Sequence, residues 1–159
     1  MGILKNFFKS NFKKSEKYSD FTWKLKIAVT LGLSSLPKEY ALLIPILKKT
    51  RDPAGDWDFY MMIAGVGMIA MLTDISRENY REMGQTLIQM NKQKPWEDGL
   101  TEFSKFITNP EEENTSISER TGWWILNKLK GAPPSQEENT TLGPAIGAYL
   151  ETAIEDLFK

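Results

Sequence analysis

Apolar residues recur along much of this chain at spacings of three and four positions, the period of an α-helix packed on one side. The pattern predicts an all-α fold, an irregular bundle of six to seven helices around one core. Beyond the first third of the chain, the expected helices cover residues 57–73, 76–92, about 95–108, 117–130 and from 144 onward.

Prolines and capping residues suggest where several of these helices begin. Ser35 precedes Leu36-Pro37, and a proline in the first turn suits a helix that runs to about Lys49. Pro45 falls inside this helix, where we expect it to bend or shorten the helix. Asp56 is the expected N-cap of helix 57–73, and Pro144 is the expected first residue of the last helix.

The helix over 117–130 has the most complete set of boundary signals. Ser116 and Glu119 have the spacing of a capping box, and Gly131 follows the last residue of the apolar pattern. Two successive prolines, Pro133 and Pro134, then prevent the helix from continuing.

The longest apolar run extends from Phe59 to Leu72 and is bracketed by Asp58 and Asp74. Its fourteen residues fall short of the roughly 20 that cross a bilayer as a helix. The run therefore predicts one continuous buried helix over 57–73 that does not span a membrane.

Residues 21–33 follow a different pattern, because every odd position is apolar. This alternation is typical of a strand. A lone strand would leave its backbone groups unpaired, however, and no other segment alternates in the same way. A helix is therefore the favoured interpretation, and a single strand at 21–33 stays open.

The first residues of the chain, over 3–17, predict an amphipathic helix with an apolar half and a lysine half. Such a helix suits an anionic membrane surface, a groove on a partner protein or the core of its own domain, and the pattern leaves all three open. Asp20 is the expected cap of the next element, which divides the chain into residues 1–19 and 20–159. The candidate membrane- or partner-binding residues are Lys5, Phe7, Phe8, Lys9, Phe12 and Lys13.

Charge is distributed unevenly along the chain. Residues 1–51 contain eleven Lys or Arg against three acids, a net charge of +8, whereas residues 52–159 contain nine against eighteen, a net charge of −9. A basic segment of this kind indicates an anionic partner. Nucleic acid is not the expected partner, because Arg51 is the only arginine in the basic third and the acidic remainder would repel phosphates.

The composition excludes several classes of chemistry. The 159 residues are enough for one core and include no cysteine and no histidine. Disulfides, thiolate or histidine catalysis and His- or Cys-ligated transition metals are therefore impossible. We expect no cofactor, no metal beyond weak binding of a hard cation near Asp52, Asp56 and Asp58, and a cytoplasmic location with possible peripheral attachment to a membrane.

A match to the dinucleotide-binding pattern occurs at Gly65, Gly67 and Ala70. The pattern lacks the strand before it and the acidic residue that should follow a second strand, so close packing of helices explains it better. The same region supports the rival hypothesis of a small-ligand-binding protein or an enzyme. Its pocket would lie among the helices that carry Met61, Met62, Gly65, Gly67, Met68 and Met71.

Two adjacent tryptophans on the helix over 117–130 suggest a second contact region. Trp123 and Trp124 project about 100° apart on a helix, so one fills the core while the other lies at the surface or at an interface. With Lys128 they form the candidate protein-contact patch. The sequence as a whole predicts a non-enzymatic interaction protein of the adaptor, immunity or assembly-subunit type.

Overall fold

Seven helices make up most of the described part of the chain, which comprises residues 17–109 and 115–157 of a computed structural model. This part holds no strand, so the predicted all-α bundle is confirmed. In chain order the helices are α2 (Tyr18–Glu39), α3 (Leu43–Lys49), α4 (Pro53–Leu72), α5 (Arg77–Met90), α6 (Trp96–Ile107), α7 (Ile117–Lys130) and α8 (Gln136–Leu157).

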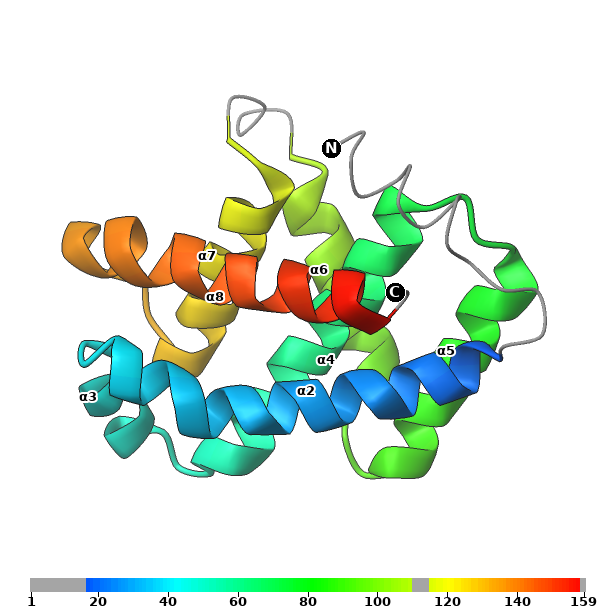
Figure 1. Cartoon of the computed structure of the whole chain (residues 1–159), viewed down its shortest axis with the longest axis horizontal. Coiled ribbons are helices and arrows are strands. Elements are labelled where there is room, and N and C mark those ends of the chain that lie inside the picture. The colour runs from blue at the N-terminus through cyan, green and yellow to red at the C-terminus, as the bar shows by residue number, and fades with distance from the viewer. Residues whose placement is uncertain (1–16, 110–114, 158–159) are drawn as a thin grey trace.

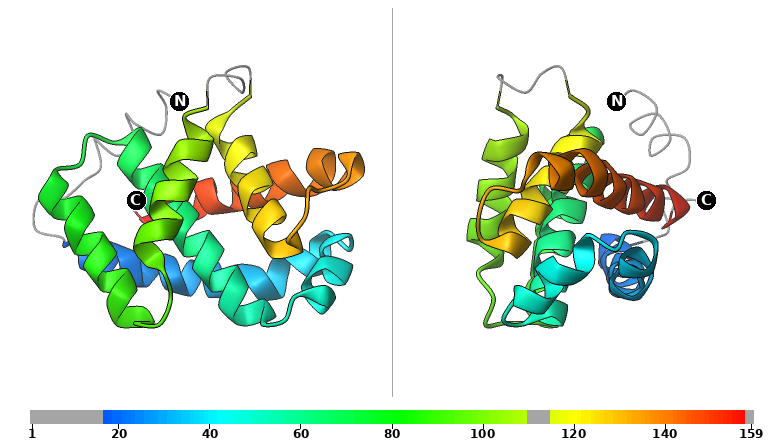
Figure 2. Two further views of the ribbon diagram at one scale, coloured as in Figure 1. Left: turned by 180° about the vertical axis from the view of Figure 1, so that it is seen from behind. Right: turned by 90° about the vertical axis from the view of Figure 1, so that its left-hand side faces the viewer.

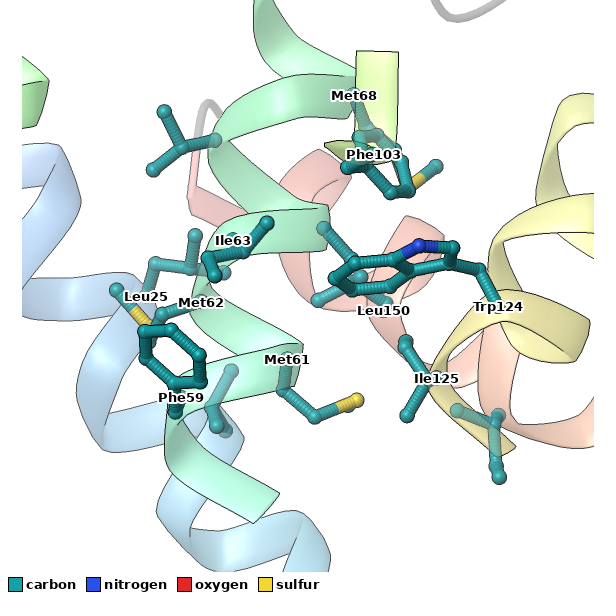
Figure 3. Close-up of a cluster of buried hydrophobic side chains, with 14 of the residues drawn as sticks. Leu25, Phe59, Met61, Met62, Ile63, Met68, Phe103, Trp124, Ile125 and Leu150 are labelled. Carbon is teal, nitrogen blue, oxygen red and sulfur yellow. The ribbon is translucent and has the colours of Figure 1, made fainter. Parts of the chain in front are cut away.

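Helix α4 lies at the centre of the bundle (Figures 1 and 2). It packs against α2, α5, α6, α7 and α8. Its apolar residues surround the helix axis, so no face of α4 can be left to water without a cost in free energy. Trp124 of α7 and Leu25 of α2 approach α4 from opposite sides, as Figure 3 shows.

The predicted helix 57–73 is confirmed as one continuous buried helix, and it begins earlier than expected. Asp52, not Asp56, is the N-cap: its side chain accepts a hydrogen bond from the Gly55 N–H at 3.2 Å. Pro53 takes the first helical position, where its missing N–H has no cost. Across the described residues, no helix is both long enough and apolar enough to cross a membrane.

The glycines of α4 allow its neighbours to approach closely. A Cβ at Gly65 would meet the Leu25 side chain of α2, and a Cβ at Gly67 would meet the Phe103 ring of α6. Both positions lie in the middle of the helix, not at a strand-to-helix turn. The match to the dinucleotide pattern is therefore explained by packing of helices.

Residues 21–33 are helical and lie within α2, as favoured above, so the single strand is wrong. The helix begins at Tyr18, and Lys17 is its N-cap without a side-chain hydrogen bond. Asp20 thus lies in the first turn and is not the cap that we expected. The division of the chain at residue 19 is not tested by these residues and stays a prediction.

The first turn predicted at Ser35 and Pro37 is wrong. α2 continues through Pro37 to Glu39, and α3 starts separately at Leu43. Pro37 lies in the last turn of α2, where it removes one backbone hydrogen bond from the helix. Burial of Leu36 in the core outweighs this cost. Pro45 does not bend a helix either, since it lies in the first turn of α3, where a proline is tolerated.

Helices α5 and α6 follow the predicted pattern closely. Ser76 caps α5 by accepting from the Asn79 N–H at 3.1 Å, and Pro95 precedes α6. The apolar face of α5 is turned to the core, because Met83 and Leu87 are buried.

The boundaries of α7 are as predicted and those of α8 are not. Ser116 accepts from the Glu119 N–H at 3.0 Å, and Gly131 ends α7 in the left-handed conformation at φ 68°. Helix α8 starts at Gln136 instead of Pro144, which lies inside the helix. The signal that was missed is the pair Ser135 and Glu138, which form a reciprocal capping box at 2.7 and 3.1 Å.

Backbones of α7 and α8 approach each other more closely than any side chain would allow. A Cβ at Gly122 would overlap the backbone of Gly143, and a Cβ at Gly147 would overlap the backbone of Ser118. Gly84 on α5 is the opposite case, since nothing lies within 4 Å of the position of its Cβ. Glycine is therefore required for packing at the α7–α8 contact and not at residue 84.

Two alanine substitutions test this difference. Gly122→Ala should lower the free energy of unfolding by about 1–3 kcal/mol, because the backbones of α7 and α8 must separate. Gly84→Ala should raise it by about 0.5–1 kcal/mol, because alanine restricts the unfolded chain and meets no neighbour. Urea unfolding followed by circular dichroism measures both, and an unchanged or raised stability of Gly122→Ala would contradict the close contact.

Candidate interaction surface

Three large apolar side chains on α2 point to solvent. Trp23, Ile27 and Leu31 are 46%, 63% and 61% exposed. They are spaced four residues apart, so they form one row along the helix, about 12 Å long, which we call the α2 stripe. The indole N–H of Trp23 has no hydrogen-bond partner among the described residues, so its donor is also free.

The opposite face of α2 is buried in the bundle. Phe21, Leu25 and Val29 are almost fully buried, and they too are four residues apart. A shift of two positions turns the side-chain direction by about 200°, so the two rows lie on opposite sides of the helix. The odd-position alternation of residues 21–33 is therefore produced by one inward row and one outward row.

Polar contacts fix the orientation of α2. The indole N–H of Trp57 on α4 donates to the Val29 carbonyl at 2.8 Å, and the hydroxyl of Tyr149 on α8 donates to the Ala28 carbonyl at 2.7 Å. Burial raises the pKa of Tyr149, which keeps this hydroxyl a neutral donor through the physiological range. Lys26 forms an ion pair with Asp58 of α4. The stripe is thus presented by a helix that is held at two neighbours.

The six N-terminal candidates (Lys5, Phe7, Phe8, Lys9, Phe12 and Lys13) lie outside the described residues. The described chain begins at Lys17, one residue before α2. The stripe therefore starts only a few residues after the basic segment in sequence.

The tryptophan patch divides as the helical geometry predicts. Trp124 is buried against Phe103 and Tyr60, with ring centroids 5.1 and 5.8 Å apart. Trp123 is half-buried and donates to the Asn139 carbonyl of α8 at 3.1 Å. Lys128 pairs with Glu102 of α6 and lies 6.0 Å from the Trp124 ring. All three residues therefore have partners within the fold, and a protein contact at this patch stays a prediction.

The region proposed for a ligand pocket is filled by its own side chains. Met61, Met62 and Met68 are fully buried, and the glycines between them are occupied by neighbouring helices. A cavity of about 120 Å³ borders this region beside Met62. Its volume is smaller than that of typical ligand pockets, which start at roughly 300 Å³.

The aspartates near the start of α4 have separate structural partners. Asp52 caps the helix, Asp58 pairs with Lys26, and Asp56 lies 3.8 Å from Lys94. Within the described residues, no three acidic side chains come together in a way that could hold a metal ion.

Comparison with protein-family models gives no match for this chain. Searches of curated proteins and of solved structures give no significant match either. The function must therefore be argued from the surface itself.

Sequence reasoning did not single out the α2 stripe as a site. The sequence feature that indicates it is the alternation of residues 21–33. Because side chains two positions apart lie on opposite sides of a helix, a helix with this pattern must expose about half of its apolar residues. Which half is exposed depends on the face that α2 turns to α4, and this is a tertiary property.

The exposure of the stripe predicts that it contributes little to folding. Replacing Ile27, the most exposed of the three, by glutamine, a good helix former, should change the free energy of unfolding by about 1 kcal/mol or less. Leu25→Ala on the opposite face should cost about 2–5 kcal/mol. Urea unfolding compares the two, and an equal loss in both variants would mean that the stripe is covered in the folded chain.

Proposed function

We propose that this chain is a non-enzymatic interaction protein that binds a helix of another protein along the α2 stripe. The observation that carries the proposal is the outward row of Trp23, Ile27 and Leu31 on a helix whose opposite face already supplies the core. Rows of exposed apolar side chains mark interaction sites when they are contiguous, and tryptophan is enriched at binding hot spots.

The size of the stripe indicates the strength of the contact. Full burial of a large apolar side chain contributes about 1.5–3 kcal/mol, and these three are already partly buried. The remaining exposed area would contribute roughly 3–5 kcal/mol before the entropy costs of association. This amount suits the centre of a reversible interface and is too small to hold an obligate dimer.

The shape of the stripe favours a helix as its occupant. Side chains four residues apart form a ridge that fits the groove between such rows on another helix. The surrounding exposed charges include both signs, Asp20 and Lys24 beside the stripe, so an anionic membrane is not the favoured occupant. The N-terminal segment carries Leu4, Phe8 and Phe12 at the same spacing, so it is a candidate competitor for the stripe. The tests therefore include a form of the protein that lacks residues 1–16.

The partner is sought by affinity purification from the cells of origin with quantitative mass spectrometry. A specific protein should be recovered with the wild type and reduced about tenfold or more with the triple glutamine variant of Trp23, Ile27 and Leu31, because the apolar contact is lost. Ile44→Gln on α3, which removes another exposed apolar side chain, is the matched control and should leave recovery unchanged.

Two further results would redirect the proposal. If no protein distinguishes the triple variant from the Ile44→Gln control, the stripe is not a protein-binding surface. If light scattering shows a wild-type dimer that the triple variant abolishes, the occupant is a second copy of the chain. Recovery that rises when residues 1–16 are deleted would mean that this segment competes for the stripe.

We propose in addition that the basic N-terminus attaches the protein to an anionic membrane. Each lysine near an anionic surface contributes about 1 kcal/mol, so reversing the charge of Lys5, Lys9 and Lys13 together should weaken binding roughly 100-fold or more. Co-sedimentation with phosphatidylserine-containing vesicles measures this, and salt should weaken the binding.

The matched control for the membrane experiment reverses Lys48, Lys49 and Lys92, which are exposed on the described part of the chain. This control should bind vesicles almost as well as the wild type. Equal loss in both triple variants, or binding to uncharged vesicles, would contradict a site-specific attachment through the N-terminus.

A further inference from the structure

A groove of about 390 Å³ lies between α5 and α6, away from the α2 stripe. The two helices meet at the loop that joins them and separate away from it (Figure 2, left). Trp96 holds this loop in place, because its indole N–H donates to the Asn91 carbonyl at 2.8 Å. The centroid of its ring also lies 4.8 Å from the centroid of the Phe59 ring. The lining of the groove includes Arg77, Tyr80, Arg81, Gly84 and Ile88 of α5 and Glu97 and Leu100 of α6.

The groove face of α5 carries features that disfavour the helix itself. Arg77 and Arg81 are like charges one turn apart, and Arg77 in the first turn opposes the helix dipole. Gly84 lies mid-helix with open space around it, although alanine would suit the helix better. Residues that weaken a helix on only one of its faces are typical of functional sites.

The charges of the groove are separated along its length. Arg77 and Arg81 are exposed at the end remote from the loop, and neither has an acidic partner among the described residues. Glu97 lies at the loop end, in the first turn of α6. Between these ends, Tyr80 and Leu100 are half-buried and Ile88 is 49% exposed, which gives an apolar floor.

We propose that this groove binds an amphipathic helix of a partner protein that is acidic toward its C-terminal end. A helix carries partial negative charge at its C-terminus and partial positive charge at its N-terminus, so it would lie with its acidic end at Arg77 and Arg81 and its N-terminus at Glu97. Its apolar side chains would contact Tyr80, Ile88 and Leu100. From Arg77 to Ile88 the groove is about 16 Å long, the length of three helical turns.

Gly84 leaves the room that the occupant needs. The absence of any atom within 4 Å of its Cβ position means that a larger side chain there would enter the groove without disturbing the core. Gly84→Leu is therefore a variant that fills the site in a folded protein, and its fold is checked by circular dichroism.

The test selects peptides of about twelve residues from a displayed random library on the full chain, with Gly84→Leu as the counter-selection. Selected peptides should carry apolar residues at helical spacing and acids near their C-termini. In fluorescence anisotropy, synthetic copies should bind about tenfold or more weakly to Gly84→Leu and to the double variant Arg77→Glu/Arg81→Glu. Lys92→Glu/Lys105→Glu, a double charge reversal outside the groove, should leave binding unchanged.

Three results would overturn the proposal. One is a selection in which no peptide distinguishes the wild type from Gly84→Leu. Another is enrichment of peptides that are basic or that bind equally well when the acids are moved to the N-terminal end. The third is self-association of the chain that the groove variants abolish, which would assign the groove to a second copy. Each result leaves the function proposed for the α2 stripe standing, because none of these variants touches that stripe.

Discussion

Burial of α4 on every side is the constraint on which the rest of this fold depends. A helix that is apolar around its whole circumference must be covered by several neighbours, and five other helices share that task. Each neighbour needs only one apolar face to do so. Gly65 and Gly67 bring Leu25 and Phe103 close to the α4 backbone, so α2 and α6 pack tightly against α4 at these positions.

This constraint explains why α2 has an unused face. Phe21, Leu25 and Val29 cover α4 and its neighbours, and nothing in the described chain covers the row on the other side of the helix. Exposed side chains of this size do not help a monomer to fold, and they favour association. The α2 stripe is therefore a feature that the core does not require, which is the physical basis for assigning it to a partner.

Local signals in the sequence predicted the helices well where those signals acted alone. The capping residues Ser116 and Gly131 gave the right boundaries of α7, because each boundary was set within one turn. The apolar run gave the right element for α4, with a start four residues too late. Pro37 and Pro144 misled the prediction, since packing and the capping pair at Ser135 outweighed their local effect. Tertiary packing decided the case of Pro37, whereas a second local signal, the capping pair at Ser135 and Glu138, decided the case of Pro144.

The binding surfaces were harder to foresee than the elements. The stripe depends on which face α2 turns inward, and the groove depends on the divergence of α5 from α6, so neither follows from spacing in one segment. The tryptophan pair shows the same limit: the sequence indicated that one ring is buried, and only the structure identifies it as Trp124.

We propose that the α2 stripe contacts another protein. The most direct test of this proposal places a photo-crosslinking amino acid at position 27 and, as a control, at the exposed position 127 of α7, in the cells of origin. If the stripe contacts one partner, position 27 should give one defined protein adduct and position 127 should give none. The absence of any adduct from position 27, or the same adducts from both positions, would contradict it.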